Sequence, residues 1–324
     1  MSDPNPNAHP SGDDRWARDT LTQLAFAAVK EQRRARRWGI FFKLLFFAYL
    51  VTLLVLVWPD DLGTATAAAK KHTALVRVDG LIASSTEASA KNVIEALRKA
   101  FKDEKTAGVI IEINSPGGSP VQAGEIYDEL QKLRQQYPKI PVHAVASDVC
   151  ASGGYYIAAA AQKIYANKAS IVGSIGVRMD SFGFTDTIAK LGVERRAYTA
   201  GNNKDFLDPF KPVNPAEVQH LQGMLDGIHQ QFIAAVKQGR GERLRENPDI
   251  FSGLMWTGEQ SIALGLVDAL GSTRYVAEDV IGEKTLVDYT QRTRWLERLL
   301  DGTQARLGAA LLRGLGLDEA VRWR

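Results

Sequence analysis

The sequence predicts an α/β protein built on a parallel sheet with crossover helices, and three observations carry that prediction. Strand-like and helix-like segments alternate from about residue 74 onward. One of them, GVIIEIN at 108–114, is an almost unbroken run of β-branched residues, which is typical of a strand buried on both faces. Hydrophobic residues make up 45% and charged residues 24% of the chain, an ordinary globular composition. Such alternation favours helices packed in layers on a sheet, joined by right-handed crossovers.

An apolar run precedes the predicted domain. From Gly39 to Trp58 the chain is apolar except for Lys43 and Thr52. About 20 helical residues span the roughly 30 Å hydrocarbon core of a bilayer. The sequence therefore predicts one transmembrane helix over 38–59, in contact with membrane lipid.

The charges on either side of this run predict its orientation. Five lysine and arginine residues lie within 30–37, and Asp60 and Asp61 follow the run. The positive-inside rule places the N-terminus in the cytoplasm and the rest of the chain across the membrane. We therefore expect a single-pass membrane protein whose N-terminus is cytoplasmic and whose main domain lies on the other side of the membrane. Small residues at 65–70 leave a cleaved signal peptide as the alternative, although the length of the run favours a retained anchor.

The first strand–helix unit follows a small-residue linker. ALVRVDGLI at 74–82 alternates between apolar and polar residues as a strand does. Ser84 and Glu87 then have the spacing of a capping box, which predicts a helix that ends near residue 102.

The next units repeat this order. After the strand at 108–114, Ser119 and Pro120 supply an N-cap and a first helical position for a helix to about residue 136. A third strand at 141–147 leads to a helix that starts at Ser152. Further elements are a strand at 163–167, a helix at 214–241 and, within 254–271, a short strand, a helix capped by Thr257 and a strand-like LVD.

Composition divides the chain into five segments without an internal repeat. They are a disordered and juxtamembrane segment (1–37), the transmembrane helix (38–59), a linker (60–73), the main domain (74–290) and an amphipathic C-terminal segment (291–324). We expect the last segment to pack on this subunit or a neighbour, with contact to a membrane surface as the lesser option.

The net charge limits the expected partners, and the cysteine content limits the possible disulfides. The net charge is +3, and no basic stripe interleaved with aromatic residues is present, so we expect no nucleic-acid partner. Cys150 is the single cysteine of the sequence, which excludes a disulfide within the chain. We expect it to be a small, buried packing residue.

Two glycine pairs follow predicted strands, in NSPGGS (114–119) and ASGG (151–154). The carboxyl ends of parallel strands share one edge of the sheet, and each loop leads into a helix N-terminus with unpaired N–H groups. Acyl transfer needs a nucleophile and two N–H donors for the oxyanion, and glycine lets the backbone approach a substrate closely. Ser152 is therefore the candidate nucleophile, and the amides of Gly118 and Gly153 are the candidate donors. Tight turns alone are the alternative interpretation.

A serine nucleophile also needs a base. None of the five histidines lies in a loop beside a glycine or an acidic partner, and no G-x-S-x-G elbow is present. A lysine can serve when it is neutral, and burial in an apolar site depresses the pKa of a lysine. Lys204, in the glycine- and asparagine-rich loop 198–210, is the candidate, although an isolated loop lysine is usually solvated. We expect the neighbouring Asp205 to point away from it.

Four segments, in this order, resemble the signal peptide peptidase A (SppA) family. They are INSPGGS, ASGGYYIAAAAQKIYANKASIVGSIGV, GNNKDFLDPF and WTGEQSIALGLVDALG. The resemblance covers roughly 74–272 and implies a membrane-anchored serine protease of the ClpP/crotonase superfold. It also implies a location in the bacterial inner membrane, with the catalytic domain on the periplasmic or extracytoplasmic side. A single catalytic unit behind an N-terminal anchor resembles the short form of the family.

The resemblance also implies a Ser–Lys dyad. It places the nucleophile at Ser152, the general base at Lys204 and a serine that hydrogen-bonds the lysine amine at Ser174. The oxyanion donors fall on Gly118 and Gly153. One departure is a cysteine two positions before the nucleophile, where small residues such as alanine are usual.

The expected activity is hydrolysis of remnant signal peptides and other short apolar peptides, by a ring-like homo-oligomer and without a cofactor or a metal. Two alternatives have different chemistry. A crotonase-type enzyme would use the paired glycines on acyl-CoA thioesters, which the anchor and the Ser–Lys pair argue against. A non-catalytic membrane scaffold would need neither the serine nor the lysine.

Overall fold

The protein consists of two compact units, Met1–Leu62 and Gly63–Arg324, in the computed structural model, which describes residues 12–57 and 70–291. In the first unit, the helix α1 (Gly12–Val57) is continuous. Within the described residues, no helix is both long and apolar enough to cross a membrane. The predicted transmembrane helix is therefore not shown, and its last two residues, 58 and 59, lie outside the described residues.

Three long parallel strands form the centre of the sheet in the second unit. They are β1 (His72–Asp79), β2 (Thr106–Ser115) and β3 (Val142–Ala151), with β2 in the middle. The apolar side chains of β2 are buried on both faces, because helices cover one face and a smaller cluster covers the other. The prediction of a layered α/β sheet is confirmed.

The strand β3 changes its neighbour half-way along. Its first half pairs with β4 (Lys163–Ala166), and its last three residues pair with β5 (Ile171–Gly173). The side chain of Asn114 accepts a hydrogen bond from the Val149 amide at 3.2 Å, near the point of this change. Because the sheet divides here, the last residues of β3 lie between β2 and β5. Ser152, the predicted nucleophile, follows them directly in the chain.

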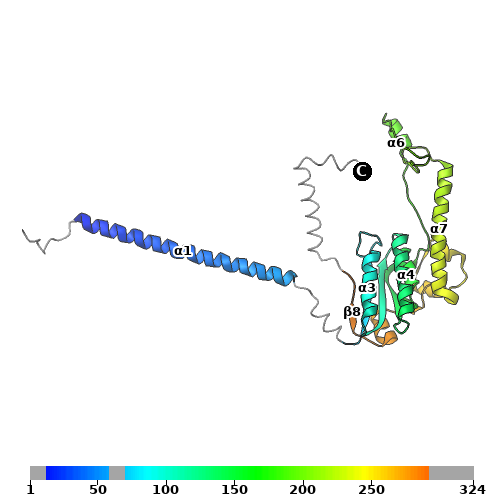
Figure 1. The fold of residues 1–324 in the computed structure, drawn as a ribbon, viewed down its shortest axis with the longest axis horizontal. Helices are drawn as coiled ribbons and strands as arrows, with labels where there is room; N and C mark the ends of the chain where they lie inside the picture. Colours follow the sequence, from blue (N-terminus) through cyan, green and yellow to red (C-terminus); the bar gives the residue numbers. More distant parts are fainter. Residues whose placement is uncertain (1–11, 58–69, 292–324) are drawn as a thin grey trace, which may run out of the picture. The chain divides into compact units, whose positions relative to one another are not determined.

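Helices α3 (Ala90–Lys102), α4 (Pro120–Gln136), α5 (Gly153–Ala158) and the C-terminal half of α7 (Pro215–Arg240) form the helical layer. Figure 1 shows α3 and α4 side by side in front of the strands, with α7 beyond them. The main apolar core lies between this layer and the sheet.

Shorter elements complete the unit. They are the helices α6 (Thr185–Lys190), α8 (Gly258–Ala263) and α9 (Thr273–Tyr275), the 3₁₀ turns Gly241–Arg243 and Pro248–Phe251, the π-helix Val276–Ile281, and the strands β6 (Met255–Thr257), β7 (Ala269–Leu270) and β8 (Leu286–Asp288). Strand β6 runs antiparallel to β5, whereas the other pairings of the sheet are parallel.

Residues 178–214, which we call the arm, connect β5 to α7 and include α6. None of them is buried. In Figure 1 the arm and the N-terminal part of α7 project away from the sheet. The second unit therefore consists of a packed body and an extension that packs little against it.

Helix α3 begins later than the capping-box spacing predicts. Its first residue is Ala90, whereas the hydroxyl of Thr86 donates hydrogen bonds to the Leu81 and Ala83 carbonyls and closes a turn. The prediction of a cap at Ser84 is therefore wrong.

Candidate active site

Ser152 occupies a sharp turn between the end of β3 and the start of α5. Its φ is 51° and its ψ is −120°, a conformation that is rare for a residue other than glycine. The backbone holds it there, because the Ser152 amide donates to the Gly173 carbonyl at 2.8 Å and its carbonyl accepts from Tyr156 at 2.9 Å. A strand–turn–helix elbow of this kind exposes a nucleophile at the edge of a sheet.

The two predicted oxyanion donors lie beside this elbow. Residue 153 is so close to the neighbouring glycine loop that a Cβ on Gly153 would lie 3.4 Å from the Gly118 nitrogen. Within the described residues, neither the Gly118 nor the Gly153 amide donates a hydrogen bond. Two free, adjacent N–H groups next to a serine are what an oxyanion requires.

Hydrogen bonds from neighbouring residues hold the glycine loop at 114–119 in place. The buried hydroxyl of Ser115 accepts a hydrogen bond from the Gly117 amide at 3.1 Å. Ile82 donates to the Gly117 carbonyl at 2.9 Å and accepts from the Ser119 amide at 2.8 Å. Sequence reasoning missed Ser115, although its position at the end of a buried strand, two residues before the first glycine, is the signal that points to it.

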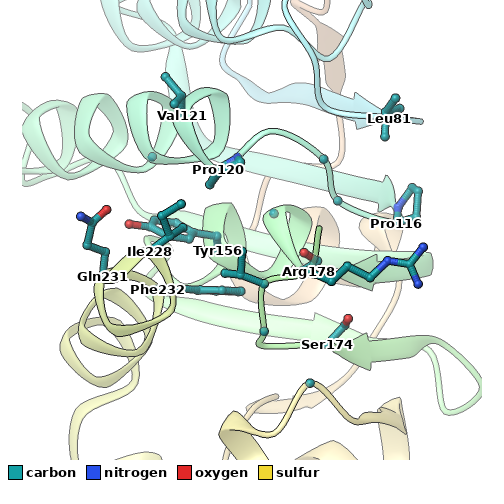
Figure 2. Close-up of a pocket in the computed structure, with 18 of the residues that line it drawn as sticks. Leu81, Pro116, Pro120, Val121, Tyr156, Ser174, Arg178, Ile228, Gln231 and Phe232 are labelled. Carbon is teal, nitrogen blue, oxygen red and sulfur yellow. The ribbon is translucent and has the colours of Figure 1, made fainter. Parts of the chain in front are cut away.

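A pocket of about 940 Å³ opens over the elbow. Ser152, Gly153, Gly118 and Ser174 all line it, together with side chains from α4, α5 and α7. Figure 2 shows Ser174 and Arg178 toward one end and Tyr156, Phe232, Ile228 and Gln231 toward the other. The lining of the cavity therefore extends from Ser174 and Arg178 at one end to side chains of α5 and α7 at the other.

Ser174 follows β5 directly and has a φ of 54°. Its amide donates to the Leu254 carbonyl at 2.7 Å. This contact fixes the chain at the pocket rim and leaves the hydroxyl of Ser174 without a hydrogen-bond partner among the described residues. Ser174 therefore lines the pocket with a free hydroxyl, and its predicted contact with a lysine amine stays a prediction.

Lys204 does not lie in this pocket. It belongs to a turn on the arm, where its side chain is exposed and its amide donates to the Gly201 carbonyl at 3.2 Å. The carboxylate of Asp205 pairs with Lys211 rather than with Lys204. That ion pair and its hydrogen bond are the main cause of the lowered pKa of Asp205. The structure thus brings together four of the five predicted site residues and leaves the lysine apart.

Within the described residues, no histidine lines this pocket either. His143 lies on β3, nine residues before Ser152, which corresponds to about 30 Å of strand. Burial lowers the pKa of His143 to about 4, so it is a neutral core residue. The predicted packing role of Cys150 is confirmed: its side chain is fully buried, and burial raises the pKa of its thiol to about 12.

Two protein-family models match the chain. The model for Peptidase family S49 matches residues 134–286, and the model for Clp protease matches residues 72–172. Together the two matches cover both glycine loops and the elbow.

Several curated proteins are similar in sequence. "Putative protease slr0021" of Synechocystis sp. is 33% identical over 274 residues, which cover 83% of this chain and 94% of that protein. "Putative signal peptide peptidase SppA" of Enterococcus faecium is 30% identical over 231 residues, covering 69% of this chain and 67% of that protein.

The Na(+)/H(+) antiporter NhaA of Brucella abortus is 46% identical over 200 residues, which cover 62% of this chain. This chain spans only 27% of the length of that protein.

Proposed function

The chain belongs to peptidase family S49, the SppA family, and from this membership we propose that it is a serine endopeptidase with Ser152 as its nucleophile. The observation that carries the proposal is the elbow at Ser152, with a positive φ and two free glycine amides beside it. Such a turn stores about 1–3 kcal/mol of backbone strain, which persists where function requires it.

The proposed reaction is acyl transfer. The Ser152 hydroxyl attacks the carbonyl carbon of the scissile peptide and gives its proton to a neutral lysine amine. The Gly118 and Gly153 amides donate to the oxyanion, and the lysinium then protonates the leaving amine. Water repeats the sequence on the acyl-enzyme and restores the serine.

We propose that Lys204 supplies the base from the arm of a second copy of the chain. Lys204 lies outside the pocket of its own chain, and the described residues that line this pocket include no lysine or histidine. The arm exposes large apolar side chains, among them Phe182, Leu191 and Tyr198, which favours its burial against another subunit. The predicted homo-oligomer would then be part of the catalytic machinery.

The pocket supports apolar peptides as substrates, because Tyr156, Ile228 and Phe232 line one end of it. Remnant signal peptides are the proposed natural class. We also propose that residues 38–59 anchor the protein in the bacterial inner membrane, with the second unit on the extracytoplasmic side. Release of the intact chain from membranes by alkaline carbonate would contradict the anchor.

The test of the activity uses Ser152→Ala in the full-length protein. Wild type should hydrolyse apolar peptides and react with a fluorophosphonate probe, whereas Ser152→Ala should do neither. Ser84→Ala, an exposed serine outside the pocket, is the matched control and should retain both properties. Undiminished hydrolysis by Ser152→Ala would exclude the proposed nucleophile.

A further inference from the structure

The wall that α4 contributes to the pocket combines apolar and acidic side chains. Val121, Glu125 and Asp128 are spaced by four and three residues, so they share one face of the helix, and all three line the pocket. Gly124, beside them, has no side chain, and a Cβ there would meet nothing within 4 Å. This wall therefore leaves room for a substrate side chain to pass along it.

The floor opposite this wall is aromatic. The rings of Tyr156 and Phe232 stack with centroids 4.8 Å apart at an angle of 24°, and Ile228 lies one turn before Phe232 on α7. Figure 2 shows these side chains grouped at one end of the pocket, with Gln231 beside them and Val121 above. A methylene chain would find apolar contacts on this floor.

The two carboxylates have no cation of their own. Within the described residues, neither the Glu125 nor the Asp128 carboxylate makes an ion pair or a hydrogen bond, whereas the Glu129 carboxylate on the same helix pairs with Arg98 at 2.7 Å. The other charged group of the pocket, Arg178, pairs with Asp180 at 3.0 Å. The acidic charge at the α4 end is therefore uncompensated.

The negative charge of Asp128 also acts on Tyr156 of the aromatic floor. The pKa of Tyr156 is raised, first by burial and then by the negative charge of Asp128. A cation held over the aromatic floor would therefore interact with the carboxylate of Asp128.

We propose that this end of the pocket selects a lysine or arginine side chain of the substrate peptide, with Glu125 and Asp128 as the specificity-determining residues. Lysine and arginine bury an aliphatic stem along apolar surface while the charged end stays near water or a counter-charge. Norleucine matches the lysine stem and lacks the cation. The inference rests on the proposed peptidase function and adds the substrate class: apolar peptides that carry a basic residue near the scissile bond.

The experiment measures kcat/KM of the full-length enzyme for paired peptides. Each pair is one apolar sequence with a single lysine or a single norleucine, and the substituted position is moved along the peptide. Mass spectrometry identifies the bond that is cleaved. We expect one position at which lysine is preferred over norleucine by about two- to fivefold, the range for an exposed ion pair.

Variants assign this preference to the two carboxylates. The double variant Glu125→Gln/Asp128→Asn should reduce the lysine-to-norleucine ratio to about one, and Asp128→Lys should favour glutamate at the same position. Glu95→Gln removes one negative charge on α3, outside the pocket, and should leave the ratio unchanged. A wild-type ratio near one at every position, or a ratio that survives the double variant, would overturn the proposal. If wild type hydrolyses none of the peptides, the peptidase function itself has failed, which is a different outcome.

Discussion

At the scale of single residues, the conformation of Ser152 depends on contacts that no local pattern reveals. Flanking glycines suggested a tight turn, but the positive φ is imposed by hydrogen bonds to Gly173 and Tyr156. Gly173 belongs to a three-residue strand that the sequence analysis did not predict. The sequence thus identified the candidate nucleophile by residue type and position, whereas its geometry required the pairing of β3 with β5.

Gly118 gives the sharpest residue-scale prediction. Its φ is 149°, and a Cβ at this position would lie 2.1 Å from the Ile82 carbonyl oxygen. Gly118→Ala must therefore displace the loop and redirect the 118 amide. Loss of one oxyanion donor costs about 10²–10³-fold in kcat, so we expect at least a hundredfold loss in peptide hydrolysis.

The measurement is kcat of Gly118→Ala, with circular dichroism to confirm that the fold remains. Gly223→Ala on α7 is the matched control, because a Cβ there meets nothing within 4 Å and residue 223 does not line the pocket. Wild-type kcat in Gly118→Ala would show that this amide does not contact the oxyanion.

At the scale of elements, the sequence predicts helix starts well where the cap is local. Ser119 and Thr257 both cap as predicted, and each side chain accepts from the amide three residues on. Helix α3 differs, because Ser89 makes no side-chain cap and the Ala90 amide donates to the Gln122 side chain at 2.8 Å. A cap supplied by another helix, 32 positions away, has no local signature.

The C-terminal end of α7 is fixed by a buried ionic cluster. Asp268 accepts hydrogen bonds from Arg240 at 2.8 Å, from Arg243 at 3.1 Å and from the Ile164 amide at 2.7 Å. Arg240 is 1% exposed, so removal of its partner leaves a buried charge uncompensated. Asp268→Asn should lower the free energy of unfolding at pH 7 by about 3 kcal/mol.

This loss should depend on pH. Burial raises the pKa of Asp268, but the hydrogen bonds and charges of its arginine partners and the Ile164 amide outweigh it, so the native pKa lies below its usual value. The stabilisation is therefore complete above the unfolded pKa of about 4 and disappears as pH falls through the native pKa. Urea unfolding of wild type and Asp268→Asn at pH 7 and in acid measures the difference, with Glu95→Gln as an exposed control. A difference that stays constant with pH would contradict the mechanism.

At the scale of the whole molecule, the sequence identified Lys204 as the candidate base but could not place it. The order of motifs along a chain does not reveal which subunit of an assembly contributes a residue to a given site. The arm that carries Lys204 has no buried residue in residues 178–214, so packing within the chain does not fix where Lys204 acts. The body around Ser152 is specified by local patterns and packing, whereas in the proposed mechanism the site is completed only by assembly.

Mixed assemblies test this dependence directly. Ser152→Ala and Lys204→Ala should each be inactive alone, and Lys204→Arg should be as inactive as Lys204→Ala because a guanidinium does not give up its proton. If the arm of one subunit supplies the lysine to the next subunit, an assembly that contains both variants regains some complete sites. In those sites Ser152 of one subunit contacts Lys204 of its neighbour. Random assembly of equal amounts around closed, head-to-tail contacts then restores about a quarter of wild-type activity.

The two variants are co-expressed with different tags, purified through both tags, and assayed for peptide hydrolysis beside each variant alone. Recovery to this level, together with loss of activity when the assembly is dissociated, is the expected result. If the doubly tagged assembly forms and has no activity, the lysine acts within its own chain or does not act at all. Because this outcome depends on which subunit supplies the lysine and not on the chemistry of the serine, it separates the assembly proposal from the assignment of Ser152.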